Sequence, residues 1–277
     1  MKIAAFADIH ANYEGLQAIS EHIEKWKPDF TLVGGDIINR GPRPRECLDF
    51  TFQKIQTDGW QVIRGNHERY VIHLGQEWPS YTEHQLAYHL PIFWTYQQLN
   101  GDLTLINSLP EQSQVLSQNG SEIRIAHASM EHDRAGIFPE TTDEDLRNKI
   151  KPPPEVMIVG HTHRPLVRQI DQTLVINVGS AGLPFDRDQR LAYAQITWQN
   201  GEWRAKIIRV DYDLSQALQD FFTTGFYEKA GPLTEIMLVE VQQAVSLLYT
   251  WAKEFRENIL SGYLTVEESV RYFLETH

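Results

Sequence analysis

The sequence predicts an α/β protein with a parallel sheet covered by helices, a second sheet, and a helical C-terminal region. Over residues 2–63, short apolar segments alternate with segments whose apolar residues recur every three or four positions. Such alternation is typical of parallel sheets with helices packed over them. Five further apolar segments between residues 156 and 210 have the length of strands, and from residue 213 the pattern becomes helical.

The first part of the chain carries the strands of the parallel sheet. Asn12 is a suitable N-cap for the first helix, whose apolar residues are spaced by three and four. In such sheets, ligands bind beyond the carboxyl ends of the strands. The elements expected here are strands at Lys2–Ala7, Phe30–Val33 and Gln61–Ile63, a helix after Asn12 and a helix at Glu46–Gln56.

The middle of the chain combines a helical insertion with shorter strands. Residues 68–99 are expected to be helical and cap-like; their aromatic side chains fit a lid that stacks on a nucleobase, although we favour packing over the sheet. Thr141 and Glu144 form a capping-box pattern that predicts a helix through Ile150. The expected strands are Leu103–Asn107, Gln114–Ser117, Glu122–Ala126, Val156–Val159, Val167–Ile170, Leu174–Asn177, Ala192–Trp198 and Trp203–Val210, the last five in a second sheet.

The pattern divides the chain into a domain over residues 1–210 and a C-terminal helical extension over residues 211–277. An apolar stripe from Leu233 to Ile259 predicts helix up to Ser261-Gly262. A last helix is expected to begin at Thr265. The extension either packs onto its own chain, which we favour, or forms a surface for a homo-oligomer.

The composition excludes several classes of protein. The 277 residues are 42% hydrophobic, as in ordinary globular proteins, and the net charge of −12 argues against general nucleic-acid binding. The single cysteine, Cys47, cannot form a disulfide within the chain, which fits a reducing compartment. Because the sequence has no signal-peptide pattern and no apolar stretch of about 18 residues, we expect a cytoplasmic protein that does not bind membranes.

Five short polar segments follow apolar, strand-like segments, and each contains residues that ligate metal ions. The Asp-x-His spacing of Asp8 and His10 places both side chains on the same side of an extended segment, and His161 and His163 share that spacing. Asp36 has two oxygens with which to bridge two cations. The candidate ligands are Asp8, His10, Asp36, Asn66, His127, His161 and His163.

Taken singly, these segments have simpler explanations, since Gly-Asp and Asn turns are common and His127 fits an ordinary core histidine. Their joint occurrence at five expected strand ends favours one dinuclear site. Histidine, carboxylate and amide ligands suit two divalent or trivalent ions, manganese before iron or zinc. Two such ions, about 3.5–4 Å apart, would hold a bridging water for attack on phosphorus. His67 would then protonate the leaving group, and Arg40 would bind phosphate oxygens.

With these residues in place, the sequence resembles the calcineurin-like metallophosphoesterase family. The resemblance implies a four-layer α/β/β/α sandwich of two packed mixed sheets, with the helical extension added. It also implies that His67 is the catalytic acid, that Arg40 binds phosphate and that Asp36 bridges the metals. One ion would be held by Asp8, His10, Asp36 and His163, and the other by Asp36, Asn66, His127 and His161. The matching segments are Asp8-x-His10, Gly35-Asp36-x-x-x-Arg40-Gly41, Gly65-Asn66-His67-Glu68, His127, Gly160-His161-x-His163 and the following loop Asn177-Val178-Gly179-Ser180.

The segment from Asp36 to Pro42 looks most like protein Ser/Thr phosphatases and symmetrical dinucleoside-tetraphosphate hydrolases. Those enzymes carry an aspartate where this chain has Asn39, and that aspartate keeps the catalytic histidine charged. The length and the helical tail are more similar to small bacterial phosphoesterases of the family, including dinucleoside-polyphosphate hydrolases. We therefore expect hydrolysis of a small phosphate ester, diester or nucleotide; the alternatives are a protein Ser/Thr phosphatase and a metal-binding scaffold or partner-binding protein without useful turnover.

Overall fold

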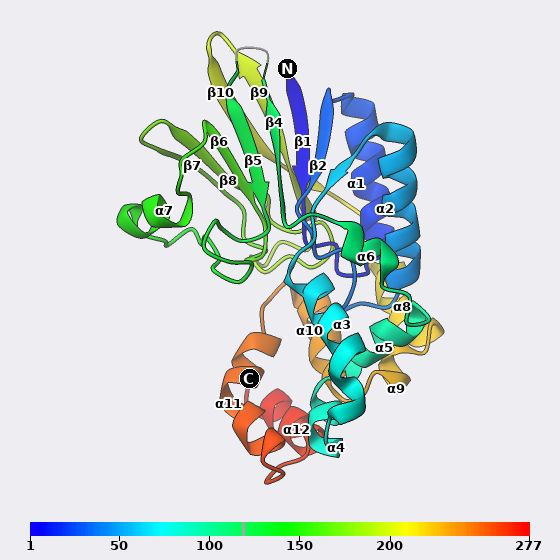
Figure 1. Cartoon of the computed structure of the whole chain (residues 1–277). Coiled ribbons are helices and arrows are strands. Elements are labelled where there is room, and N and C mark those ends of the chain that lie inside the picture. Colours follow the sequence, from blue (N-terminus) through cyan, green and yellow to red (C-terminus); the bar gives the residue numbers. More distant parts are fainter. Residues whose placement is uncertain (118–119) are drawn as a thin grey trace.

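The computed structural model describes residues 1–117 and 120–277. Two five-stranded mixed sheets pack face to face, with helices on the outer face of each, and a group of helices lies below the carboxyl ends of the strands (Figure 1). The four-layer α/β/β/α sandwich expected from the family resemblance is therefore confirmed, as is the helical C-terminal region.

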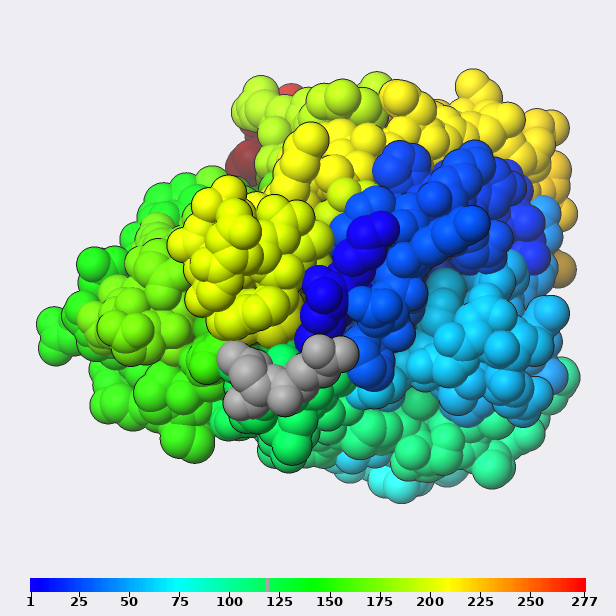
Figure 2. Space-filling view, turned by 90° about the horizontal axis from the view of Figure 1, so that it is seen from above, coloured from blue at the N-terminus to red at the C-terminus, as the bar shows by residue number. Residues whose placement is uncertain are grey.

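The first sheet has the strand order β10-β9-β1-β2-β3. Strands β1, β2 and β3 are parallel, whereas β9 and β10 form an antiparallel hairpin whose strand β9 pairs with β1. The expectation that these last two strands belong to the second sheet is therefore wrong, because their hairpin extends the first sheet at β1. Seen from the amino-terminal end of β1, the dark blue start of the chain lies beside the yellow hairpin, about 190 residues later in sequence (Figure 2). The bounds are β1 Lys2–Phe6, β2 Phe30–Val33, β3 Gln61–Val62, β9 Leu191–Gln199 and β10 Glu202–Val210, with α1 Tyr13–Trp26 and α2 Pro44–Asp58 on the outer face.

The second sheet has the order β4-β5-β6-β8-β7, with β5, β6 and β8 parallel. Its inner face meets the first sheet through fully buried aliphatic side chains such as Ile3, Ile125 and Ile176. Its outer face is covered by α7 through Leu146. The bounds are β4 Gln112–Leu116, β5 Glu122–Ala126, β6 Val156–Val159, β7 Leu166–Ile170, β8 Thr173–Asn177 and α7 Asp143–Lys149.

The remaining helices form one helical group from two parts of the chain. Tyr88 stacks on Trp251, with ring centroids 5.6 Å apart, and Trp94 packs on Phe226 at 4.7 Å, so the middle segment and the C-terminal helices share a core. Among the described helices, none is long and apolar enough to cross a membrane. The bounds are α3 Asn66–Glu77, η1 Trp78–Ser80, α4 Glu83–Tyr88, α5 Leu90–Gln98, α6 Thr104–Ser108, α8 Leu214–Thr223, α9 Phe226–Lys229, α10 Leu233–Gln243, α11 Leu248–Leu260 and α12 Val266–Thr276.

One expected strand is wrong. The segment Leu103–Asn107 is not a strand but lies largely in the short helix α6. The carboxylate of Asp102 accepts a hydrogen bond from the backbone N–H of Thr104 at 2.9 Å, which supports the first turn of the helix. Ile106 packs into the core on the outer face of the first sheet, and this burial decides the conformation of a segment whose apolar pattern is ambiguous.

Two further boundaries differ from the expectation. The apolar stripe from Leu233 to Ile259 is divided between α10 and α11, because Ala244 adopts a left-handed conformation with φ of 53°. Helix α7 is capped by Thr142 and not by Thr141; the Thr142 hydroxyl accepts from the N–H of Asp145, while that of Thr141 accepts from Phe138.

Candidate metal centre

All seven expected ligands meet at the carboxyl edge of the two sheets. Asp8 and His10 follow β1, Asp36 follows β2, and Asn66 begins the helix after β3. The other three ligands follow strands of the second sheet: His127 follows β5, and His161 and His163 follow β6. Apart from His161, which is partly exposed, each of these side chains belongs to a residue that is at most 3% exposed.

Among the described residues the candidate ligand atoms form three groups, and the middle one, His10, Asp36 and His67, shares one member with each of the other two. In the first, Nε2 of His10 lies 3.1 Å from Nε2 of His163, and the latter lies 3.6 Å from Oδ1 of Asp8. In the third, Asp36, His127 and His161 gather their ligand atoms within 4.8 Å of one another. Asp36 belongs to the middle group and to the group with His127 and His161.

The carboxylate of Asp36 connects the first and the third of these groups. Its Oδ2 is 3.7 Å from Nε2 of His10 and 3.2 Å from Nε2 of His127. Oδ1 of Asn66 lies 2.9 Å from that same His127 nitrogen. This is the position that a carboxylate bridging two cations requires.

The backbone at the site is unusual. Left-handed conformations cost a residue other than glycine about 1–3 kcal/mol, and they persist only where the surrounding structure enforces them. Their concentration here shows that the fold sets these side chains at the expense of local backbone energy. The residues concerned are Asp8, His10, Asp36, His161 and His163, with φ between 50° and 68°.

Two glycines allow the loops to approach the ligands. A Cβ atom on Gly65 would lie 2.2 Å from Oδ1 of Asp36, and one on Gly160 would lie 2.5 Å from Oδ2 of Asp8. Neither position has room for a side chain. Both glycines stand next to expected ligands in the sequence, but only the structure shows which atoms they approach.

Glu68 holds the loop after β2, a role that its sequence did not reveal. The side chain is fully buried, and its Oε2 accepts from the N–H groups of Asp36 and Gly65 at 2.8 and 2.7 Å. Its Oε1 accepts from Ile37 and Ile38 at 2.7 and 3.1 Å. A single carboxylate therefore joins the loops that carry Asp36 and Asn66.

The loop after β8 supports the same edge. The hydroxyl of Ser180 donates to the carbonyl of Asp8 at 2.7 Å, and Nδ2 of Asn177 donates to the carbonyl of Gly160 at 2.9 Å. Both residues are fully buried. The loop therefore fixes the first and last ligand segments relative to each other.

Burial sets the pKa values of most of the histidines. Burial and a neighbouring positive charge hold the pKa of His10 and of His163 well below the ordinary value. Burial, followed by the charge of His127, lowers the pKa of His161 to about 3. Burial also lowers the pKa of His67 to about 4. These imidazoles are neutral near pH 7, which is the form that binds metal ions.

His127 and Asp36 form the charged pair of the site. Burial lowers the pKa of His127, but the charge of Asp36 outweighs burial and raises it to about 10. Burial raises the pKa of Asp36, but His127 outweighs this and holds it well below its usual range. Burial raises the pKa of Asp8 well above the ordinary value. Within the protein alone, the proton on His127 supplies positive charge where a cation would otherwise do so.

The donor set fits a cation. The other ring nitrogens of His10 and His163, their Nδ1 atoms, lie against backbone carbonyls, so each of these neutral rings donates there and turns its Nε2 lone pair inward. Two such lone pairs then face each other at 3.1 Å between His10 and His163. Oδ1 of Asp8 is also buried without a hydrogen-bond partner among the described residues. Buried polar atoms normally have partners, and a bound cation would satisfy all three atoms.

His67 and Asn39 lie next to this cluster. The His67 ring packs edge-on against that of His10, with centroids 4.8 Å apart, and its backbone N–H donates to Oδ1 of Asp36. Nδ2 of Asn39 lies 2.8 Å from Nδ1 of His67. The amide orientation follows from its oxygen, which accepts from the N–H of Arg40 at 2.9 Å. His67 therefore accepts at Nδ1 and carries its proton on Nε2.

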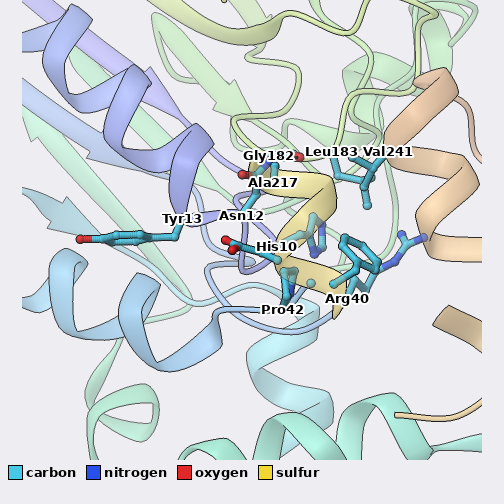
Figure 3. A pocket seen from close by; sticks show the side chains of 12 residues that line it. His10, Asn12, Tyr13, Arg40, Pro42, Gly182, Leu183, Ala217 and Val241 are labelled. Atoms are coloured by element: carbon cyan, nitrogen blue, oxygen red, sulfur yellow. Dashed lines mark hydrogen bonds between the residues drawn. The ribbon is translucent and has the colours of Figure 1, made fainter. Parts of the chain in front are cut away.

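Arg40 lies beside the cluster, but it has a partner that the sequence did not indicate. Its Nη2 donates to Oε2 of Glu240, a fully buried residue of α10. A small pocket lined by His10, Arg40, Leu183 and Val241 lies between the cluster and the C-terminal helices (Figure 3). The arginine expected to bind phosphate thus faces a pocket that includes a candidate metal ligand.

A two-sheet sandwich with histidine, carboxylate and amide ligands gathered at its carboxyl edge defines a metal-dependent hydrolase of the dinuclear type. Residues 1–201 match the sequence model of the calcineurin-like phosphoesterase superfamily domain, and the chain belongs to this family. It is accordingly a metallophosphoesterase, a hydrolase of phosphoester bonds. The family depends on two metal ions, and the clustered histidines and aspartates are the candidate ligands for them.

A sequence relative and two solved structures each match more than four fifths of the chain. The uncharacterized protein MJ0912 of Methanocaldococcus jannaschii is 27% identical over 249 residues, which are 83% of this chain and 95% of the relative. A metallophosphoesterase structure from Sphaerobacter thermophilus superposes with a TM-score of 0.67 at 22% identity, covering 88% of this chain and all of that one. The hypothetical protein PH1004 from Pyrococcus horikoshii gives 0.69 at 20% identity, covering 84% and 97%.

Proposed function

We propose that this protein hydrolyses a small phosphate ester, diester or nucleotide, such as a dinucleoside polyphosphate, with two manganese ions bound by the seven ligands. The observation that carries the proposal is the depth of the site. Six of the seven ligands are at most 3% exposed, and the pocket beside His10 is closed on one side by α8 and α10. A small phosphorylated molecule fits such a site better than a folded protein substrate does.

The protein residues have separate tasks in this proposal. Asp8, His10, Asp36 and His163 would hold one ion, and Asp36, Asn66, His127 and His161 the other. When bound, the ions would lower the pKa of a water molecule and neutralise phosphoryl oxygens. Arg40 would bind a further phosphoryl oxygen, and the helices would exclude bulk water from the site.

His67 is the proposed general acid. Asn39 keeps the proton of the neutral ring on Nε2, the nitrogen that is free to face a leaving-group oxygen. The ring lies against that of His10 and is partly exposed. To act as a general acid and end as a neutral ring, His67 would first gain a proton from solvent at Nδ1, displacing the Asn39 hydrogen bond, and the imidazolium would then give its Nε2 proton to the leaving-group oxygen.

The protein-phosphatase alternative is disfavoured by Asn39 and by the covered arginine. A phosphoprotein must bring a peptide backbone up to the metals, whereas here Arg40 is 11% exposed in its side chain and is enclosed by Glu240. The scaffold alternative is disfavoured because His67, Arg40 and all seven ligands are placed together. The donor types suit manganese, iron or zinc, and of these we propose manganese.

An assay series tests the proposal. Purified protein, stripped of metal and reloaded with manganese, is expected to release nitrophenol from nitrophenyl phosphate or its bis-ester. Dinucleoside polyphosphates and phosphopeptides are then compared by kcat/KM, and we expect the nucleotides to be the better substrates. Preference for phosphopeptides would support the phosphatase alternative, and no metal-dependent hydrolysis of any of them would support the scaffold.

A further inference from the structure

We propose that Glu240, on the C-terminal helix α10, is a positioning residue for Arg40, so that the C-terminal helices complete the phosphate-binding part of the site. The inference rests on the proposed function, because it takes Arg40 as the phosphate-binding residue. The two residues are 200 positions apart, and Glu240 lies outside the residues 1–201 that match the family domain. The ion pair therefore connects the family domain to a part of the chain beyond it.

Glu240 is itself rigidly held. It is fully buried, and its Oε1 accepts hydrogen bonds from the backbone N–H groups of Leu247 and Leu248, at 2.8 Å each. These N–H groups start α11, just after the left-handed break at Ala244. With Oε1 occupied in this way, Oε2 is left to accept from Nη2 of Arg40. A carboxylate fixed by two backbone groups gives the arginine a fixed direction.

A second contact locates the guanidinium relative to the metal centre. The Cζ atom of Arg40 lies over the ring of Phe185, 5.5 Å from the ring centroid. Phe185 in turn stacks on the ring of His163, with centroids 4.3 Å apart and planes at 11°. Arg40 is thus held between a buried carboxylate and a ring that packs on a candidate metal ligand.

The held arginine keeps a donor available. Nε of Arg40 is buried and has no hydrogen-bond partner within residues 1–117 and 120–277. Buried donors of this kind are rare, and their desolvation is costly unless a ligand satisfies them. Arg40 and His10 line the same pocket, whose volume of about 10 Å³ has room for a single oxygen-sized group, so one phosphoryl oxygen is the partner proposed there (Figure 3).

The test replaces Glu240 by glutamine. In Glu240→Gln the amide oxygen can still accept from Leu247 and Leu248, but the NH2 group cannot accept from Arg40. Inorganic phosphate is the probe, measured by calorimetry and as an inhibitor of nitrophenyl phosphate hydrolysis. We expect phosphate affinity to fall and KM to rise by about tenfold, the effect of one charge-assisted hydrogen bond. We expect kcat and metal content to stay close to those of the wild type, because the lost interaction binds the phosphate equally well in the ground state and in the transition state.

Two variants separate positioning from general destabilisation. Ser269→Ala removes another buried hydrogen bond of the C-terminal helices, the one that the ring N–H of Trp251 donates to Ser269, and we expect it to lower stability without weakening phosphate binding. In an Arg40→Ala background, Glu240→Gln should change phosphate affinity no further. Wild-type phosphate affinity in Glu240→Gln, or an undiminished effect in the Arg40→Ala background, would overturn the inference. A wild-type protein with no metal-dependent hydrolysis would instead contradict the proposed function.

A measurement on the wild type covers the case in which Glu240→Gln does not fold. In a crystal structure of the metal-loaded protein with inorganic phosphate, a phosphate oxygen should lie within hydrogen-bond distance of Arg40 Nε while the pair with Glu240 stays intact. Phosphate bound without Arg40, or Arg40 turned away from Glu240, would show that this residue does not position the arginine.

Discussion

At the scale of single residues, Asn39 decides which nitrogen of His67 carries the proton. Its amide oxygen is committed to the backbone N–H of Arg40, so its NH2 group faces Nδ1 of His67. An aspartate at this position would accept from Nδ1–H instead, and its charge would favour the ring protonated at both nitrogens. The substitution that distinguishes this chain from the protein phosphatases it resembles therefore changes the protonation of the proposed acid.

We predict that Asn39→Asp puts a proton on Nδ1 of His67, the nitrogen that is unprotonated in the wild type. Because the two ring nitrogens have different ¹⁵N chemical shifts in each tautomer, NMR of the zinc-loaded protein at neutral pH measures the change. The wild type should show a protonated Nε2 and the variant a protonated Nδ1. The same tautomer in both proteins would contradict the hydrogen-bond assignment between Asn39 and His67.

His67 itself should be needed for turnover but not for metal binding. We predict that His67→Ala retains both metal ions, because the seven expected ligands are untouched, and loses about 10²–10⁴-fold in kcat, the usual contribution of a general acid. Metal analysis and steady-state kinetics on the same preparation measure both effects. Tyr70→Phe is a matched control, since Tyr70 packs on the His67 ring at 5.2 Å but has no proposed part in proton transfer. Normal activity in His67→Ala would remove the acid role.

At the scale of elements, helix α8 holds the loop between Asp36 and α2. The two oxygens of Asp220, which is 1% exposed, accept from Nε and Nη2 of Arg43 at 2.5 and 2.7 Å. Burial raises the pKa of Asp220, but the hydrogen bonds from Arg43 outweigh it, and the pKa is lowered from its ordinary 3.8. The charged form is therefore the one that stabilises the folded protein.

We predict that Asp220→Asn lowers the free energy of unfolding by about 2 kcal/mol at pH 7. Because the folded pKa lies below the unfolded value of 3.8, the contribution of Asp220 is fully present above pH 3.8 and is lost as the pH falls through the folded pKa. Denaturant unfolding of both proteins at several pH values measures the difference. A gap between them that stays constant into the acid range would show that ionisation of Asp220 is not its source.

The elements also show where a pattern in sequence stops being informative. Strands β1, β2 and β6 were predicted closely, because continuous apolar segments bounded by turns allow few other structures. Helix α6 was not predicted, because a five-residue apolar segment fits a strand equally well. Its helical conformation depends on the hydrogen bond to Asp102 and on the burial of Ile106 in the core. The break at Ala244 has no glycine or proline to mark it; it depends on Glu240, which binds N–H groups beyond the break.

At the scale of the whole molecule, the sequence was sufficient to predict which side chains gather but not what holds them. Asp8, His10 and the other ligands stand in short segments at strand ends, so their convergence follows from the topology of parallel strands. Glu68 and Glu240 act through contacts with residues that are distant or lie in the backbone, and the sequence carries no local signal for such contacts. Long-range support of this kind requires the folded structure.

Metal removal should change the stability of the whole molecule. Ions that bind only the folded protein stabilise it by about 2.7 kcal/mol for each site at a hundredfold excess over Kd, which raises Tm by about 5–10 °C for a chain of this size. We therefore predict that a chelator lowers the Tm of the purified protein and that added manganese restores it. Calorimetry measures this without any substrate, so the result is independent of which phosphate ester is hydrolysed.

Asp36→Asn provides the contrast for this prediction, because Asp36 Oδ2 lies near the candidate ligand nitrogens of His10 and His127. The variant should bind little metal and its Tm should not respond to manganese. The variant should also be less stable than the wild type without metal. Removing the charge of Asp36 leaves the protonated imidazole of His127 buried without its partner. If manganese raised the Tm of Asp36→Asn as much as that of the wild type, the ions would bind elsewhere, and the bridging position assigned to Asp36 would be wrong.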